Sequence, residues 1–150
     1  MKKALVVDDD PIIRNIIGAL LRRRGVAAAQ AANGDEAMLL LRASLDHARR
    51  SEYDLVVLDL MMPKVSGWDV IRFIVDELPA LKPHVLVVSA TGESALDEIR
   101  AHGLGAIVPK PFDADHFYAA VDQTVRRMPE AEGESMAVVA LCLAAIAPLF

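Results

Sequence analysis

Apolar and polar residues follow two alternating patterns along the chain. Short apolar runs bounded by acids, glycines or prolines are typical of strands that are buried on both faces of a parallel sheet. Between these runs, apolar residues recur every three or four positions, as they do on the inner face of a helix. Strands are predicted at residues 4–7, 26–31, 54–58, 85–88 and 106–108.

Each stretch of helical spacing has a start or stop signal. Asp10 suits the N-cap of the first helix, Pro11 its first position and Gly25 its end. The second helix follows Asn33, and its apolar positions predict that it runs to about residue 50. The ends of the other three helices are marked by Ser66 and Pro79, by Gly103 and by Asp113.

The alternation of strands and helices predicts an α/β fold, a doubly wound five-stranded parallel sheet with helices on both faces and right-handed crossovers. Pro109 has no N–H to donate, so the fifth strand is predicted to lie at an edge of the sheet. A chain of 150 residues suits one domain. We predict a domain at 1–128, a polar linker at 129–135 and an apolar, helical C-terminal tail at 136–150.

Charge and cysteine content exclude several classes of protein. The net charge of −5 disfavours direct nucleic-acid binding. The one cysteine, Cys142, allows neither a disulfide framework nor a thiolate metal site. The apolar run at the N-terminus is too short for a signal peptide, so a cytoplasmic location is expected.

Polar side chains follow four of the five predicted strands. Asp8 and Asp9 come after the first strand, Asp59 after the third, Ser89 after the fourth and Lys110 after the fifth. Open α/β sheets bind their ligands at the carboxyl ends of the strands, and all these ends meet at one edge. We therefore expect the five side chains to converge there.

Such a cluster needs cations, because two carboxylates about 4 Å apart repel by about 4 kcal/mol at an effective dielectric near 20. Lys110 supplies one positive charge. The remaining donors are oxygens, which favour a hard cation such as magnesium, Mg²⁺. A carboxylate in these surroundings can attack phosphorus and form an acyl phosphate, with the Ser89 hydroxyl bonding a phosphoryl oxygen.

Each of these residues also has an ordinary structural interpretation. An acid after a strand can cap a helix, a serine can bond the local backbone, and a lysine can lie at the surface. The occurrence of all five at strand ends favours chemistry over these alternatives. For Asp10 the N-cap role is favoured over a ligand role, and for Thr91 a cap of the fourth helix is favoured over a role in dephosphorylation.

Four motifs, in this order, together resemble the receiver domain of two-component response regulators, the chemotaxis regulators included. The motifs are Val-Val-Asp8-Asp9, Leu-Asp59-Leu-Met-Met-Pro63 with Gly67, Ser89-Ala90, and Lys110-Pro111. The resemblance covers about residues 1–128. It implies a flavodoxin-like fold with strand order 2-1-3-4-5, and a phosphoacceptor switch, not an enzyme with a separate substrate.

The resemblance also implies a role for each site residue. Asp59 would accept a phosphoryl group from a histidine kinase or histidine phosphotransfer protein. Asp9, Asp59 and the backbone carbonyl of Met61 would hold Mg²⁺, with Asp8 acting through water. Ser89 and Lys110 would contact the phosphate, and the peptide bond that follows Lys110 would be cis.

One position departs from the family pattern. Members usually carry an aromatic residue three positions before the lysine, and this chain has Ile107. We therefore expect a smaller or different readout at the surface of helix four, strand five and helix five. Nothing long enough for an effector domain follows residue 128, so a downstream protein target is expected, with a homodimer through that surface or the tail as a further option.

The tail at 136–150 carries no charge. As a helix it would span about 22 Å, less than the ~30 Å of a bilayer core, which disfavours a membrane span. Packing on its own domain, on a second copy or on a partner stays open. Two other functions compete: a receiver-like module that does not switch, and an aspartyl-phosphate hydrolase, whose usual second acid is replaced here by Met61.

Overall fold

In the computed structural model, which describes residues 1–90 and 92–125, five strands form one parallel sheet. The strand order is β2-β1-β3-β4-β5, as expected from the resemblance. The strands are β1 (Lys3–Val7), β2 (Ala27–Ala31), β3 (Leu55–Leu58), β4 (Val85–Ser89) and β5 (Ala106–Pro109). The helices are α1 (Pro11–Arg23), α2 (Gly34–Ala43), α3 (Gly67–Glu77), α4 (Glu93–Ala101) and α5 (Ala114–Val125), with a 3₁₀ helix η1 (Pro79–His84).

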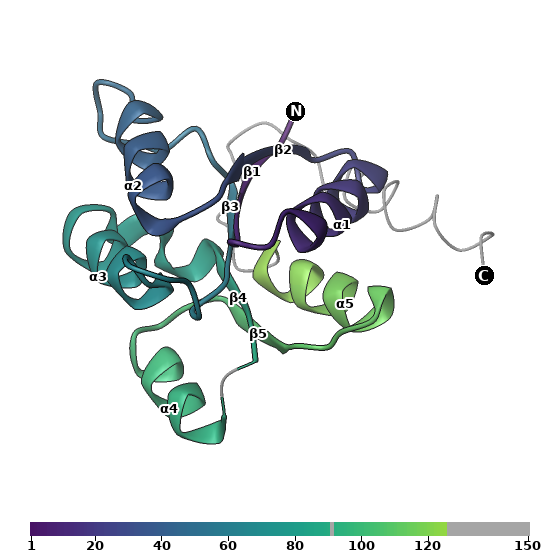
Figure 1. The fold of residues 1–150 in the computed structure, drawn as a ribbon. Helices are drawn as coiled ribbons and strands as arrows, with labels where there is room; N and C mark the ends of the chain where they lie inside the picture. Colours follow the sequence, from purple (N-terminus) through teal and green to yellow (C-terminus); the bar gives the residue numbers. More distant parts are fainter. Residues whose placement is uncertain (91, 126–150) are drawn as a thin grey trace.

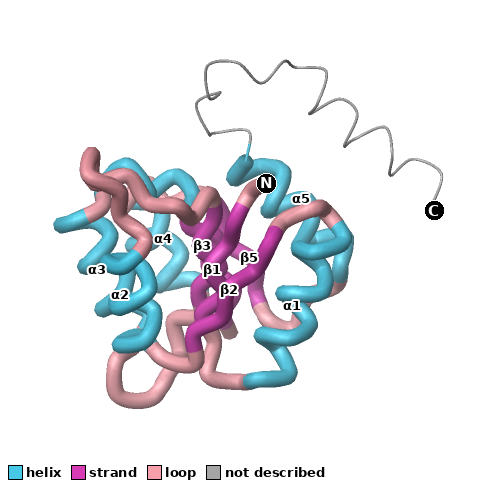
Figure 2. The backbone as a smooth tube through the Cα atoms, turned by 90° about the horizontal axis from the view of Figure 1, so that it is seen from above, coloured by secondary structure: helices cyan, strands magenta, loops and turns pink. Residues whose placement is uncertain are grey.

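The sheet separates two helical layers, each with its own core. Helices α1 and α5 cover one face, and α2, α3 and α4 cover the other (Figures 1 and 2). Successive strand residues point to opposite faces. In β1, Leu5 and Val7 therefore join the core under α2 and α3, whereas Ala4 and Val6 join the core under α1 and α5.

The predicted helix starts are confirmed by capping contacts. The Asp10 carboxylate accepts a hydrogen bond from the Ile12 amide at 2.8 Å. The Asn33 side chain accepts one from the Glu36 amide, also at 2.8 Å. These contacts satisfy amide groups that have no partner within the first turn of a helix.

The predicted length of α2 is wrong, because the helix ends at Ala43 and not near residue 50. The Ser44 hydroxyl donates to the Leu41 carbonyl at 2.7 Å and helps to close the last turn. The Asp46 carboxylate then accepts the amides of Ala48 and Arg50, at 2.8 and 2.9 Å. The hydrogen bonds from these side chains replace the hydrogen bonds of a helix in the backbone of 44–51. The helix therefore ends although the helical spacing of apolar residues continues.

Pro79 not only follows α3 but also begins a short helix that the sequence did not predict. Pro79 was expected only to stop the third helix, which does end at Glu77. The chain then forms the short helix η1, with Pro79 at its first position. Proline suits that position because its φ is already helical and its missing N–H would have no partner there.

The fifth strand lies at one edge of the sheet, as predicted, and among the described strands it pairs only with β4. None of the helices in the described part of the chain is long and apolar enough to span a bilayer. Thr91, the linker at 129–135 and the tail at 136–150 lie outside the described residues, so the predictions made for them stay predictions.

Candidate functional site

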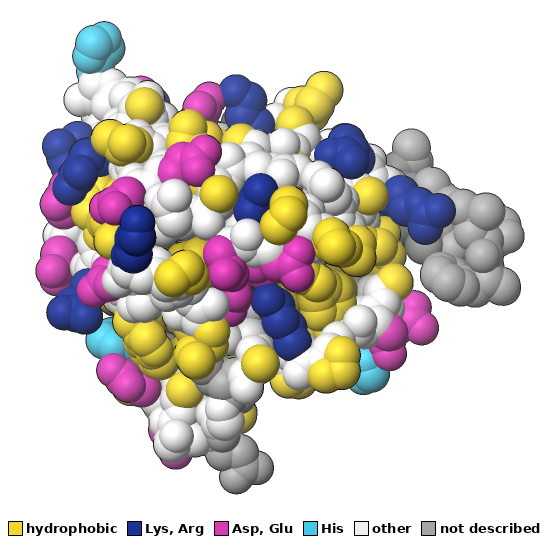
Figure 3. Space-filling view, viewed as in Figure 1, with side chains coloured by type: hydrophobic (Ala, Val, Ile, Leu, Met, Phe, Trp, Pro, Cys, Tyr) yellow, Lys and Arg dark blue, Asp and Glu magenta, His cyan; other side chains and the backbone are white. Residues whose placement is uncertain are grey.

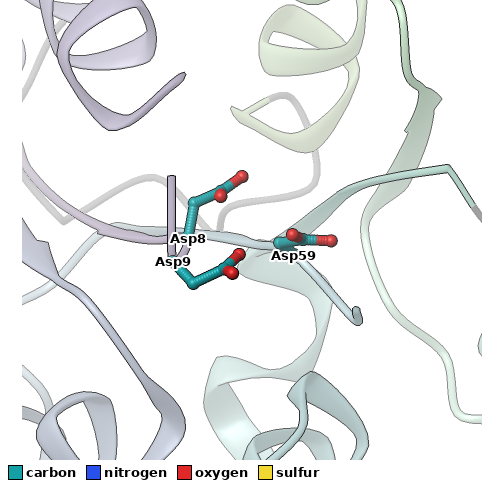
Figure 4. Close-up of side chains that lie close together, drawn as sticks. All are labelled: Asp8, Asp9 and Asp59. Atoms are coloured by element: carbon teal, nitrogen blue, oxygen red, sulfur yellow. The ribbon is translucent and has the colours of Figure 1, made fainter. Parts of the chain in front are cut away.

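The five predicted residues converge at the edge of the sheet where the strands end, called here the carboxyl edge. Asp8 and Asp9 follow β1, Asp59 follows β3, Ser89 ends β4 and Lys110 follows β5. Figure 4 shows the three carboxylates side by side, and one oxygen from each lies within 4.8 Å of the other two. The space-filling view shows acidic side chains beside a basic one on this face of the molecule (Figure 3).

Lys110 ties two of the carboxylates together. Its Nζ lies 2.6 Å from Oδ2 of Asp8 and 3.2 Å from Oδ2 of Asp59. Burial alone would lower the pKa of Lys110, but the hydrogen bond to Asp8 and the charge of Asp59 outweigh it. The pKa of Lys110 is therefore raised above 10.5, and the ammonium stays charged at neutral pH.

The second oxygen of Asp59 is also held. Its Oδ1 accepts hydrogen bonds from the Ser89 hydroxyl and from the Met61 amide, both at 3.1 Å. Asp59 is only 4% exposed, and Ser89 only 2%. The carboxylate that the sequence singled out is thus fixed in orientation by three neighbours while its edge of the sheet faces solvent.

The two acids after β1 differ in their surroundings. Asp8 is 1% exposed and accepts the Asp10 amide at 2.9 Å in addition to Lys110. Asp9 is exposed, and its side chain forms no hydrogen bond or ion pair with the described residues. Within residues 1–90 and 92–125, the three carboxylates thus share one lysine, which pairs with two of them, so the site keeps an excess of negative charge and one free ligand.

Gly67 contributes to the site in a way that the sequence did not reveal. A Cβ atom at this position would overlap the Asp59 carbonyl oxygen and lie 2.6 Å from the Leu60 Cα. The Gly67 amide donates to the Leu60 carbonyl at 3.1 Å. Glycine is thus required because the start of α3 passes directly against the backbone of the phosphoacceptor candidate.

Arg14 is a supporting residue that the sequence analysis missed. Its guanidinium donates to the Asp8 backbone carbonyl at 2.6 Å and to Oε1 of Gln30 at 3.3 Å. It therefore links the loop after β1 to both α1 and β2. One signal was available, since a cation near the start of a helix opposes the helix dipole and needs a local partner.

Two further expectations concern the chain around β5. The peptide bond between Lys110 and Pro111 is cis, as the resemblance implied. Ile107 pairs in register with Val87, is partly buried and packs against the core under α2 and α3. The aliphatic side chain thus occupies an inward position in this structure.

Comparison with known proteins gives consistent results. Residues 4–122 match the family model of the response regulator receiver domain. The chain is 35% identical over 130 residues to the DNA-binding dual master transcriptional regulator RpaA of Synechocystis sp.. This alignment covers 85% of this chain and 50% of RpaA. It is 34% identical over 131 residues to the CpxR homolog of Haemophilus influenzae, in an alignment that covers 85% of this chain and 52% of the homolog.

Among solved structures, the response regulator TrrA of Thermotoga maritima, in complex with Mg(2+)-BeF, shares 30% identity with a TM-score of 0.68. The alignment covers 83% of this chain and 99% of that one. The chain spans about half the length of the curated relatives named above. The family model and these relatives together show that this chain belongs to the response regulator receiver domain family.

Proposed function

We propose that the protein is a single-domain response regulator that accepts a phosphoryl group on Asp59 and signals through protein–protein contacts. The observation that carries this proposal is the setting of Asp59. Its carboxylate is buried, lies at the carboxyl edge, and is held between the Lys110 ammonium and the Ser89 hydroxyl. A structural acid would have no use for both groups.

The donor set fits Mg²⁺. Three carboxylates and a single lysine leave uncompensated negative charge, and all the free donors are oxygens. We propose that Asp9, Asp59 and the Met61 carbonyl hold the ion, with Asp8 acting through water. When bound, Mg²⁺ would neutralise charge on the phosphoryl oxygens. The relative TrrA was solved in complex with Mg(2+)-BeF.

The chain's own residues would act in a single displacement. A carboxylate oxygen of Asp59 attacks the phosphorus of a phosphohistidine, an O–P bond forms, and the N–P bond breaks. The electron pair of that bond stays on the imidazole nitrogen of the donor, which then takes up a proton. Lys110 and Ser89, which now bond Asp59, are placed to bond the transferred phosphoryl oxygens.

The partners of the switch are proposed from the same surface. A histidine kinase or histidine phosphotransfer protein would supply the phosphoryl group. A downstream protein, or a second copy, would bind the surface formed by α4, β5 and α5. Because Ile107 is already partly buried against the core under α2 and α3, we propose a readout that differs from rotation of an aromatic side chain. The DNA-binding activity named for RpaA belongs to a longer protein, of which the match with this chain covers 50%.

Beryllofluoride, a phosphoryl mimic, tests the proposal. Adding it with Mg²⁺ to ¹⁵N-labelled protein is expected to shift amide resonances around Asp59 and Lys110. Asp59→Asn is expected to abolish the shifts, because the variant lacks the anionic oxygen that the mimic binds. Asp76→Asn, which changes an exposed acid on α3, is the matched control and should respond like the wild type. A wild-type protein that gives no shift at saturating Mg²⁺ would contradict the proposal.

A small-molecule phosphatase is the less favoured function. Position 61, where such enzymes usually place their second acid, holds a methionine that is 64% exposed. The side chain cannot donate a proton to a leaving group. Turnover of a small phosphate ester would be needed to support this alternative.

A further inference from the structure

The loop between β1 and α1 carries Asp9, the least constrained of the three carboxylates at the site. Asp9 is exposed, and its side chain forms no hydrogen bond or ion pair with the described residues. One of its carboxylate oxygens nevertheless lies within 4.8 Å of an oxygen of Asp8 and of Asp59, and these like charges repel (Figure 4). The backbone of the loop must therefore keep Asp9 in place.

The Asp8 carbonyl belongs to the peptide unit that lies directly before Asp9. Because a peptide unit is planar, the direction of this carbonyl also fixes the N–H and the Cα of Asp9. The Arg14 guanidinium donates to the carbonyl through Nη1 at 2.6 Å, a short hydrogen bond of the kind that a charged donor forms. Arg14 thus holds the peptide unit from which the Asp9 side chain extends.

Arg14 is in turn held by the edge strand β2. Its Nε donates to Oε1 of Gln30 at 3.3 Å, and Nε2 of Gln30 donates to Oδ1 of Asn15, also at 3.3 Å. Gln30 pairs in register with Val6 of β1, so this contact ties the guanidinium to the sheet. Arg14 and Gln30 are both half-buried. The planar guanidinium therefore has two contact points, the loop carbonyl and the strand amide, which suit its fixed donor geometry.

The charge of Arg14 has the opposite effect on a cation. A guanidinium beside the loop repels Mg²⁺, so loss of the charge alone would strengthen binding of the ion. Asp9 is exposed to solvent, where water and salt screen that repulsion. Loss of a group that orients a metal ligand, in contrast, commonly lowers metal affinity by about tenfold or more. The effect on position is therefore expected to exceed the effect of charge.

We propose that Arg14 is a positioning residue for the Mg²⁺ site. Its contact with the Asp8 carbonyl, supported by Gln30, keeps Asp9 where its carboxylate can bind the ion. The inference rests on the proposed function, because that function assigns Mg²⁺ to these acids. Arg14 acts through the backbone of the loop, so its removal weakens Mg²⁺ binding even though it also removes a positive charge.

A Mg²⁺ titration of the ¹⁵N-labelled full chain tests this role. The amide resonances around Asp9 and Asp59 report binding by the folded state, so a variant that is less stable but folded still gives its own affinity. Arg14→Met is expected to raise the dissociation constant for Mg²⁺ by about tenfold. Arg23→Met removes an exposed cation from the other end of α1, and as the matched control it should bind Mg²⁺ like the wild type.

Gln30→Met separates position from charge, because no charge is changed. It is expected to weaken Mg²⁺ binding by a smaller factor than Arg14→Met. The double variant should bind no more weakly than Arg14→Met alone, because Gln30 acts through Arg14. Losses that add in the double variant would overturn the support assigned to Gln30.

The possible failures of the test have different meanings. Equal or tighter Mg²⁺ binding by folded Arg14→Met would overturn the inference and leave the proposed function intact. If Arg14→Met does not fold, wild-type affinity in Gln30→Met would overturn the inference instead. A wild-type protein that binds no Mg²⁺ would contradict the metal site of the proposed function, and this inference with it.

Discussion

Charged side chains form ion pairs at both ends of the strands, but their exposure to solvent differs. At the carboxyl edge, Lys110 forms ion pairs with Asp8 and Asp59, whose side chains are at most 5% exposed. At the opposite, amino edge, Lys3 pairs with Glu52 through side chains that are 51% and 46% exposed. The same kind of contact is therefore buried at one edge and solvated at the other.

The difference in exposure changes what each ion pair contributes to stability. An exposed ion pair contributes about 0–1 kcal/mol and can be lost at little cost. A buried pair contributes little net energy when it is complete, but removal of one partner leaves an uncompensated charge and is strongly destabilising. The carboxyl edge thus keeps a charge arrangement that stability alone would not select, which is consistent with a chemical role for it.

Replacement of a lysine at each edge gives the largest expected contrast. Lys110→Met leaves Asp8 and Asp59 buried without their cation, so the free energy of unfolding should fall by about 3–5 kcal/mol in Mg²⁺-free buffer. Lys3→Met removes an exposed pair and should cost less than about 1 kcal/mol. Urea unfolding of both variants measures the difference. Equal losses would show that the two edges are electrostatically alike.

Glycine replacements test both edges for steric constraint. Gly67→Ala and Gly105→Ala each place a methyl group against neighbouring backbone, so each should lower stability by about 1–3 kcal/mol. Gly92→Ala faces open space and should change stability by less than about 0.5 kcal/mol. In addition, only Gly67→Ala should weaken beryllofluoride binding, because its methyl group displaces the backbone of Asp59. If Gly105→Ala weakens that binding equally, the site is not confined to the carboxyl edge.

The smallest effect is a pH dependence of opposite sign at the two edges. Burial lowers the pKa of His84, at the amino edge, below 6.5, and within the described residues its Nδ1 is buried with no hydrogen-bond partner. The unfolded chain then binds the proton more tightly, so stability is complete above pH 6.5 and falls as the pH is lowered. The raised pKa of Lys110 acts in reverse: its contribution is complete below pH 10.5 and is lost as the pH rises through the folded pKa.

Unfolding measured across this range should show both limbs. His84→Gln should flatten the acid limb, and Lys110→Met should reduce the alkaline limb. Some alkaline dependence should remain in Lys110→Met, because burial also raises the pKa of Tyr53 above 10.0. An acid limb that persists unchanged in His84→Gln would remove His84 as its cause.

The strand order and the convergence at the carboxyl edge could be predicted because they follow from simple rules. Buried apolar runs separated by helical patterns allow few topologies, and parallel strands bring their ends together. The sequence could therefore predict that Asp8, Asp59, Ser89 and Lys110 lie together, and in the structure they are joined by hydrogen bonds.

Features decided by single side-chain contacts could not be predicted in this way. The apolar spacing of Leu45 and Ala48 favoured a longer α2, but the hydrogen bonds of Ser44 and Asp46 end it. The contact of Arg14 with a backbone carbonyl has no apolar periodicity to reveal it. Periodicity reports which face is buried, and it does not report how polar side chains compete for the backbone.

The two cores on either side of the sheet have a consequence for how the sequence can vary. Val56 and Val57 are neighbours in β3, yet the first belongs to the core under α2 and α3 and the second to the core under α1 and α5. Substitutions in distant, independent regions usually have additive effects on stability, whereas those that share a core do not. Substitutions in one core can therefore accumulate without matching substitutions in the other core.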